Sequence, residues 1–175
     1  ALLSGVAGAS EWRELAPMSE VRSGPGVLAY DGKVWVFGGH DYATSTSSAT
    51  VEVYDPASDA WSPRTAIPGA RRNAAVAECD GLIYLFGGQT TGSTKFRTTY
   101  IYDPVADSWS SGTDIPGVYQ DGGRCGATAI TLGSEIWLVG GYDGSTPQET
   151  RVDIYHPDTD SWESGPSLNH PLQEG

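Results

Sequence analysis

Three arginines share one position in an internally repeated sequence, and arginine is the side chain best suited to holding carboxylates. Arg22, Arg71 and Arg124 each stand 16 residues before the first glycine of a Gly-Gly pair. A guanidinium group donates two parallel hydrogen bonds to one carboxylate, so three of them brought together by the fold would bind an acidic ligand. The alternative is structural, with the same groups holding turns through backbone carbonyls and acidic neighbours. The pairs are Gly38-Gly39, Gly87-Gly88 and Gly140-Gly141.

Tyrosines in variable segments are the second set of candidate binding residues. The stretches that follow the glycine pairs, residues 40–48, 89–95 and 142–147, differ in every repeat. On a repeated scaffold, such variable loops carry specificity, so Tyr42 and Tyr142 are predicted to contact a ligand. Tyr119 lies in a five-residue insertion at 118–122 and is predicted to be an exposed anchor for a partner. The alternative for this insertion is a surface loop without a role.

No arrangement of residues in the sequence indicates catalysis or metal binding. His40, His156 and His170 fall at unrelated repeat positions, and neither Cys79 nor Cys125 has an obvious base beside it. The aspartate pairs lie in turns, where their side chains satisfy local amides and are too few to hold calcium. The sequence therefore predicts a non-catalytic protein with no cofactor and no metal.

The charge balance limits the partners. Ten Lys and Arg against 22 Asp and Glu give a net charge of −12, which repels nucleic acid and anionic lipid. Nucleic acid binding is therefore not expected. No apolar run approaches the ~18 residues of a membrane-spanning helix, so membrane insertion is not expected either.

Two lysines and the Ser/Thr-rich loops favour an extracellular protein. Residues 1–10 are predicted to be an N-terminal arm or the remnant of a signal peptide.

The repeats in the sequence predict the strands and turns that position these side chains. The glycine pairs are 49 and 53 residues apart, and each is followed by a Tyr-x-Pro turn and by a Trp seven residues after that Tyr. Trp12 precedes the first pair by 26 residues, as Trp61 precedes the second. The three tyrosines are Tyr54, Tyr102 and Tyr155, and the three tryptophans are Trp61, Trp109 and Trp162.

Each repeat is predicted to form four short strands. In the first, the strands are residues 26–30, 33–37, 51–54 and 60–62, and Asp31-Gly32 suits a two-residue hairpin turn. The second strand is nearly all apolar, as expected for a strand buried on both faces. The double glycine that follows would let neighbouring backbones approach closely. The repeated Tyr and Trp would fill the space between adjacent sheets. All of these repeat residues are predicted to be structural.

This pattern of an apolar strand, a double glycine, a Tyr and a Trp resembles the kelch-repeat family of β-propellers over about residues 11–168. The resemblance implies an all-β fold of three four-stranded antiparallel blades. It also implies that Arg22, Arg71 and Arg124 line the mouth of a central channel, where kelch domains bind acidic peptides. The predicted segments are 1–10 (arm), 11–23 (unpartnered outer strand and linker), 24–68, 69–116 and 117–168 (blades 1 to 3) and 169–175 (tail).

Three blades cannot close a propeller, which typically has 4–8. The apolar faces of the end blades must therefore be covered. We expect self-assembly through these faces into a homo-oligomer or filament, with Trp12 and Leu15 in an N-terminal strand that pairs with a second copy. The alternatives are a fragment of a longer extracellular propeller enzyme, of the carbohydrate-active or galactose-oxidase type, and an adaptor that binds acidic peptides through the arginines.

Overall fold

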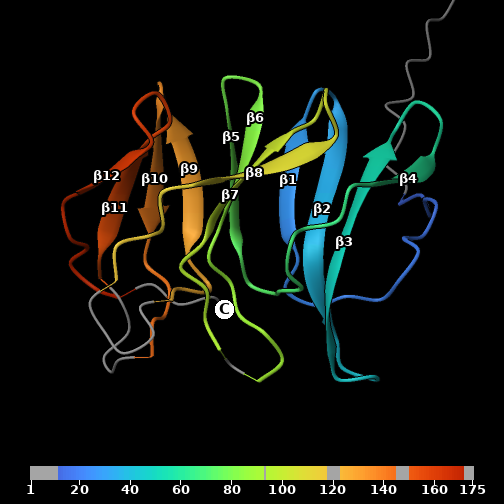
Figure 1. The fold of residues 1–175 in the computed structure, drawn as a ribbon. Coiled ribbons are helices and arrows are strands. Elements are labelled where there is room, and N and C mark those ends of the chain that lie inside the picture. Colours follow the sequence, from blue (N-terminus) through green and yellow to red (C-terminus); the bar gives the residue numbers. More distant parts are fainter. Residues whose placement is uncertain (1–11, 93, 118–122, 145–149, 172–175) are drawn as a thin grey trace, which may run out of the picture.

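The computed structural model describes residues 12–92, 94–117, 123–144 and 150–171. Over these residues it contains three four-stranded sheets, each with antiparallel strands in sequence order, which confirms the predicted fold class (Figure 1). Blade 1 comprises β1 (Gly26–Tyr30), β2 (Lys33–Asp41), β3 (Thr46–Asp55) and β4 (Ala60–Arg64). Blade 2 comprises β5 (Ala75–Cys79), β6 (Leu82–Phe86), β7 (Thr99–Asp103) and β8 (Ser108–Gly112). Blade 3 comprises β9 (Thr128–Leu132), β10 (Glu135–Val139), β11 (Val152–His156) and β12 (Ser161–Ser164).

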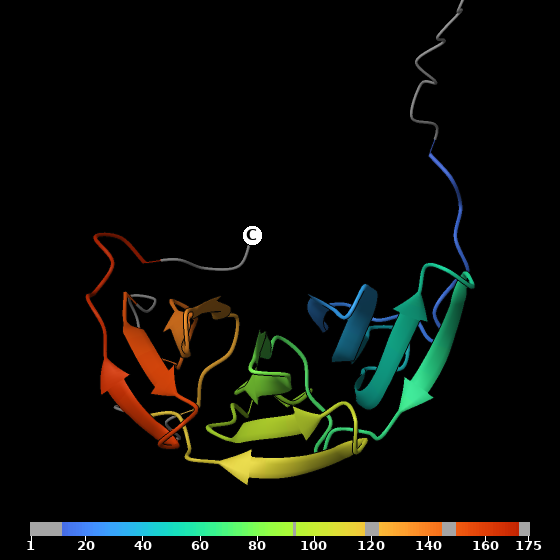
Figure 2. The same ribbon diagram turned by 90° about the horizontal axis from the view of Figure 1, so that it is seen from above.

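The three blades lie side by side in an open arc (Figure 2). The first strand of each blade, β1, β5 or β9, lies on the inner side of the arc, and the last strand, β4, β8 or β12, lies on the outer side. Two apolar clusters fill the spaces between the blades. One is built around Trp35 and Phe37 of blade 1 and Ile83 of blade 2, and the other around Phe86 of blade 2 and Ile136 of blade 3.

The hairpin turns follow the residues that the sequence supplies. Asp31 and Gly32 both have positive φ, at 50° and 68°, as a type I′ turn requires. The corresponding Gly133 has φ 64°, whereas Ser134 is not among the residues with positive φ, which is the pattern of a type II′ turn. The third hairpin therefore makes the same two-residue turn with one positive-φ residue instead of two.

The double glycines mark the places where one blade meets the next. Gly38 has φ 61°, and a Cβ on it would lie 2.3 Å from the carbonyl oxygen of Arg71 in blade 2. The neighbouring Gly39 N–H donates to that same oxygen at 2.9 Å. Gly88 donates in the same way to the carbonyl oxygen of Arg124 at 2.8 Å. A side chain at the first glycine would therefore separate the blades.

The described residues 12–22 form no strand within a single chain. The outer strand expected within 11–23 stays a prediction, because it was expected to pair with a second copy. One expectation is corrected. In blade 1 the second and third strands are longer than expected. They continue past a bulge between Phe37 and Gly39 to a hairpin that ends at Asp41 and Thr46.

Candidate functional site

The guanidinium of Arg71 is buried against residues of blade 2. The residue is 1% exposed, and its Nη1 donates to the carbonyl oxygen of Gly87 at 2.9 Å and to Thr98 Oγ1 at 2.8 Å. The rings of Phe96 and Tyr100 lie 4.2 and 4.7 Å from its Cζ, so cation–π contacts take the place of a carboxylate. Burial lowers the pKa of Arg71 from its usual value.

Arg124 and Arg22 occupy the corresponding places beside carboxylates. Arg124 is 1% exposed and pairs with Asp153 through Nη1, while its Nε donates to the carbonyl oxygen of Gly140 at 2.6 Å. The side chain of Arg22 is fully buried and pairs with Glu52 and, at 2.9 Å, with Glu20. The prediction that these three arginines form a ligand-binding rim is therefore corrected. Their charged groups are enclosed and already bonded, as the structural alternative described.

A different arginine reaches the variable loops. Arg72 follows Arg71, and successive side chains of an extended segment point in opposite directions. Its side chain contacts Tyr42 of the β2–β3 loop, and this loop lies at the lower end of Figure 1. Its Nη1 donates to the hydroxyl of Tyr42 at 3.0 Å, with its Cζ 5.9 Å from the centre of that ring. Tyr42 is 67% exposed, and the edge of His40 packs against it at 4.6 Å between ring centres.

A second pair of the same kind lies between blades 2 and 3. The Lys95 ammonium, in the β6–β7 connection, stands 4.7 Å from the ring centre of Tyr142, which follows β10. Cys125 is buried beneath this pair, with its Sγ 3.5 Å from Gln89 Oε1 and from the carbonyl oxygen of Tyr142. We call Tyr42, Arg72, Lys95 and Tyr142 the loop face.

The structure brings together two of the tyrosines predicted from the sequence and adds two cations that sequence reasoning missed. Arg72 could have been found from its alternation with Arg71, and Lys95 from its place in a variable loop. Ser47 Oγ and Thr91 Oγ1, 3.1 Å apart, join the loops of blades 1 and 2, so these loops form one surface. Tyr119 and the insertion at 118–122 lie outside the described residues.

The repeated Tyr and Trp form a bonding unit with an aspartate and with the linker that enters each blade. In blade 2, Tyr102 donates to Asp107, whose carboxylate also accepts the Thr65 N–H at 2.9 Å, and Trp109 Nε1 donates to the carbonyl oxygen of Thr65 at 2.9 Å. The hydrogen bond from Tyr102 lowers the pKa of Asp107, while burial and the same bond raise that of the tyrosine.

The same unit recurs in the other two blades. Tyr54, Asp59 and Trp61 form it with Ala16 in blade 1, and Tyr155, Asp160 and Trp162 form it with Thr113 in blade 3.

The residues predicted to mediate assembly are exposed. Trp12 is 102% exposed and Leu15 is 46% exposed. Ile130 and Leu132 of β9, on the open face of blade 3, are 47% and 53% exposed. Within the part of the chain that the structure describes, no group of three His, Cys, Asp or Glu side chains is placed to hold a metal ion. Over the same residues, no helix has the length and apolar character needed to cross a membrane.

Comparison with known proteins places this arrangement in a class of repeat propellers. A family model described as the KLHDC2/KLHL20/DRC7 Kelch-repeats domain matches residues 9–141, and a Kelch motif model matches residues 123–169. Beta-scruin of Limulus polyphemus is 32% identical over 155 residues, and Kelch-like protein 25 of Xenopus tropicalis is 28% identical over 165 residues. The chain belongs to the kelch-repeat family, as the repeat pattern predicted.

The matched proteins are longer than this chain. The alignments cover 84% of the chain but 16% of beta-scruin, and 93% of the chain but 26% of Kelch-like protein 25. The solved structure of YjhT superposes with a TM-score of 0.79 at 18% identity and covers 93% of this chain and 57% of that chain. At this identity the likeness concerns the fold alone.

Proposed function

We propose that this chain is a non-catalytic protein-interaction module and that its loop face binds an acidic segment of a partner protein. The observation that carries the proposal is the pairing of a cation with a tyrosine at two places on one surface, Arg72 with Tyr42 and Lys95 with Tyr142. Arginine and tyrosine are the residue types that most often dominate binding energy in protein interfaces. Cations on an acidic protein also favour a ligand of opposite charge.

The test is a selection of peptides from a random phage-displayed library on the immobilised chain. The selected peptides should be enriched in Asp and Glu. The Tyr42→Ala and Arg72→Ala changes should each weaken their binding by about tenfold or more, as expected for interface residues of this type. Arg64→Ala is the matched control because Arg64 is an exposed arginine on the outer strand β4.

Stability is checked in the same variants by urea unfolding. Tyr42 is exposed and Arg72 is half-buried, so each change should lower the unfolding midpoint far less than the loss of a core residue would. Peptides without an excess of acidic residues, or binding that survives both changes in folded protein, would refute the proposed site.

The second candidate function is docking of further kelch blades on the open faces of blades 1 and 3, with copies of this chain as one source. Its support is that Ile130 and Leu132 of blade 3 are about half exposed, whereas Ala77 and Cys79, at the same positions in blade 2, are 3% and 2% exposed. Uncovered apolar side chains at positions that another blade normally buries favour association.

Light scattering at several protein concentrations tests self-association. A dimer, a larger oligomer or a filament supports it, and the double change Ile130→Glu and Leu132→Glu should return the mass to that of one chain. Val105→Glu is the control because Val105 is 93% exposed in the turn between β7 and β8, away from the open faces. A monomer at all concentrations argues against copies as the source of the docked blades.

The alternative that the chain is part of a propeller enzyme predicts copper in a metal analysis or hydrolysis of a glycan by the longer protein.

A further inference from the structure

The tryptophans on the outer strands differ in one respect, which is whether an aromatic ring from the preceding blade reaches them. Phe37 of blade 1 packs edge-on against Trp109 of blade 2, with ring centres 6.1 Å apart at 82°. Phe86 of blade 2 meets Trp162 of blade 3 in the same way, at 5.4 Å and 74°. Among the described residues, Trp61 of blade 1 has only its own Tyr54, at 5.2 Å.

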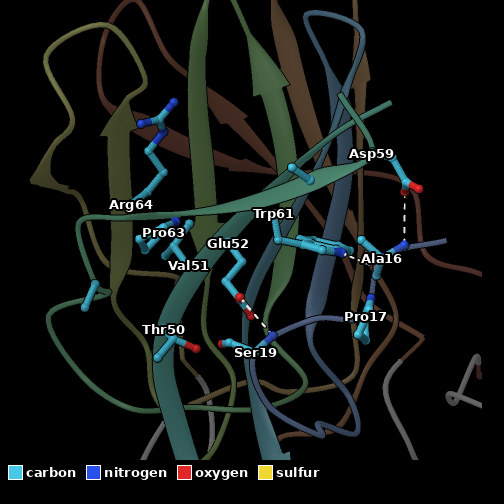
Figure 3. Close-up of a pocket in the computed structure, with 12 residues that line it drawn as sticks. Ala16, Pro17, Ser19, Thr50, Val51, Glu52, Asp59, Trp61, Pro63 and Arg64 are labelled. Carbon is cyan, nitrogen blue, oxygen red and sulfur yellow. Dashed lines mark hydrogen bonds between the residues drawn. The ribbon is translucent and has the colours of Figure 1, made fainter. Parts of the chain in front are cut away.

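A pocket of about 530 Å³ lies beside Trp61 (Figure 3). Its walls are Ala16, Pro17 and Ser19 of the linker on one side and Glu52, Trp61 and Pro63 of β3 and β4 on the other. A pocket of this size with an aromatic wall accommodates an apolar side chain.

The linker beside this pocket has the geometry of a linker that leaves a complete blade. Trp61 Nε1 donates to the carbonyl oxygen of Ala16 at 2.8 Å, and the Ala16 N–H donates to Asp59 at 3.0 Å. Thr65 and Thr113, which follow the outer strands of blades 1 and 2, make the same two bonds to the next blade. Trp12 precedes Ala16 by the four residues that separate Trp61 from Thr65. It therefore occupies the position of a tryptophan on the outer strand of a preceding blade.

We propose that the pocket beside Trp61 receives an aromatic side chain from a further kelch blade that lies outside these 175 residues and has Trp12 in its outer strand. The aromatic residue would stand at the end of the second strand of that blade, where Phe37 and Phe86 stand in blades 1 and 2. This inference rests on the second candidate function, the docking of blades on the open faces, and names the partner at one of them.

Blade 3 of a second copy does not fit the same place. Its residue at the position of Phe37 and Phe86 is Val139, which is too small to reach a tryptophan as a phenyl ring does. If blade 3 of a copy docked here, Pro166 would take the place of Ala16. Pro166 stands two residues before Leu168, as Thr65 stands two residues before Ile67, and the backbone N–H groups of Leu168 and Ile67 make equivalent bonds. Proline has no backbone N–H, so it cannot donate to Asp59.

The test adds a blade by repeating part of blade 1. In this variant a copy of residues 22–60 stands directly before Trp12 in place of residues 1–11, so that Trp12 follows Ala60 as Trp61 does in blade 1. The expected result is slower amide hydrogen exchange at Ala16 and in β4, by about tenfold or more, because burial by a docked blade suppresses local opening. A folded variant with parental exchange rates at these positions would overturn the proposal.

Two changes within the added copy test the aromatic requirement. Phe37→Val in that copy reproduces the size of Val139 and should remove most of the protection, whereas Val27→Ala, on the opposite face of the added blade, should leave it unchanged. Equal protection with phenylalanine and valine would refute the requirement for an aromatic side chain in the pocket beside Trp61.

Two measurements on the unmodified chain complete the test. Titration with 4-methylphenol, followed by nuclear magnetic resonance, should shift the Trp61 indole N–H in a saturable way and leave Trp109 and Trp162 unchanged. The absence of such a shift counts against the pocket even if the enlarged variant does not fold. If instead the chain forms dimers in which β4 is protected from exchange, a second copy fills the pocket. That result overturns this inference while supporting docking on the open faces.

Discussion

Removing the carboxylate of Asp153 should destabilise the chain strongly, because it takes a buried ion-pair partner away from the Arg124 guanidinium. Asp153 and Arg124 are each 1% exposed, and Asp153 also accepts Arg151 Nε at 2.7 Å. Breaking a buried ion pair by deleting one partner costs about 3–5 kcal/mol. At ~2–4 °C per kcal/mol for a domain of this size, Asp153→Ala should lower the melting temperature by about 6–20 °C.

The assays are thermal unfolding for the melting temperature and urea unfolding for the free energy, both followed by circular dichroism, with two comparison variants. Glu20→Ala removes a half-buried partner of Arg22 while the buried Glu52 stays in place, so it should cost less than Asp153→Ala, by about 1 kcal/mol or more. The double variant Arg124→Met and Asp153→Leu replaces both charges by apolar groups and should recover most of the loss. A loss below about 1 kcal/mol for Asp153→Ala would show that the buried pair does not hold blade 3 as described.

Two further predictions concern the glycine pairs and the bonding unit of each blade. Gly38→Ala should lower the urea midpoint far more than Gly32→Ala, because both have positive φ but only the first would place a Cβ against a backbone oxygen, 2.3 Å away. For Asp107, a folded-state pKa held below the unfolded value of about 3.9 contributes stability that is present above that value. This stability is lost as the pH falls through the depressed pKa. Asp107→Asn should therefore be less stable at pH 7 and lose less stability on acidification below about pH 4, as measured by urea midpoints from pH 7 to pH 3.

Most of the fold could be predicted from the repeats because each repeated residue meets a requirement that is local in sequence. A glycine with positive φ, an Asp-Gly hairpin and an apolar second strand each restrict the backbone without reference to distant residues. The ends of β2 and β3 were not foreseen because the extra pairs past the bulge involve Gly39 and Ser48 in a loop of polar residues. Such residues form strands only where a partner strand happens to continue.

The candidate site was harder to predict because it depends on which way a side chain turns. Arg71 and Arg72 are adjacent and chemically identical, yet the first bonds the carbonyl oxygen of Gly87 and the second bonds Tyr42. The shared repeat position suggested a binding role for Arg71, but a residue that every blade needs for its structure also recurs in every blade. Arg72 corresponds to Ser23 and Cys125 in the other repeats, and this lack of recurrence distinguishes it from the structural arginines.

The bonding unit of Tyr, Asp and Trp links the docking of the blades to the order in which they are synthesised. In each blade the aspartate and the tryptophan bond a linker that lies earlier in the sequence, such as Thr65 for blade 2 and Thr113 for blade 3. A blade emerging from the ribosome therefore finds its docking surface already made by the part of the chain that precedes it. Domains fold as units from the N-terminus during synthesis, and nearest-neighbour contacts let repeats add one at a time. Blade 2 can thus complete its contacts with blade 1 before blade 3 has been translated.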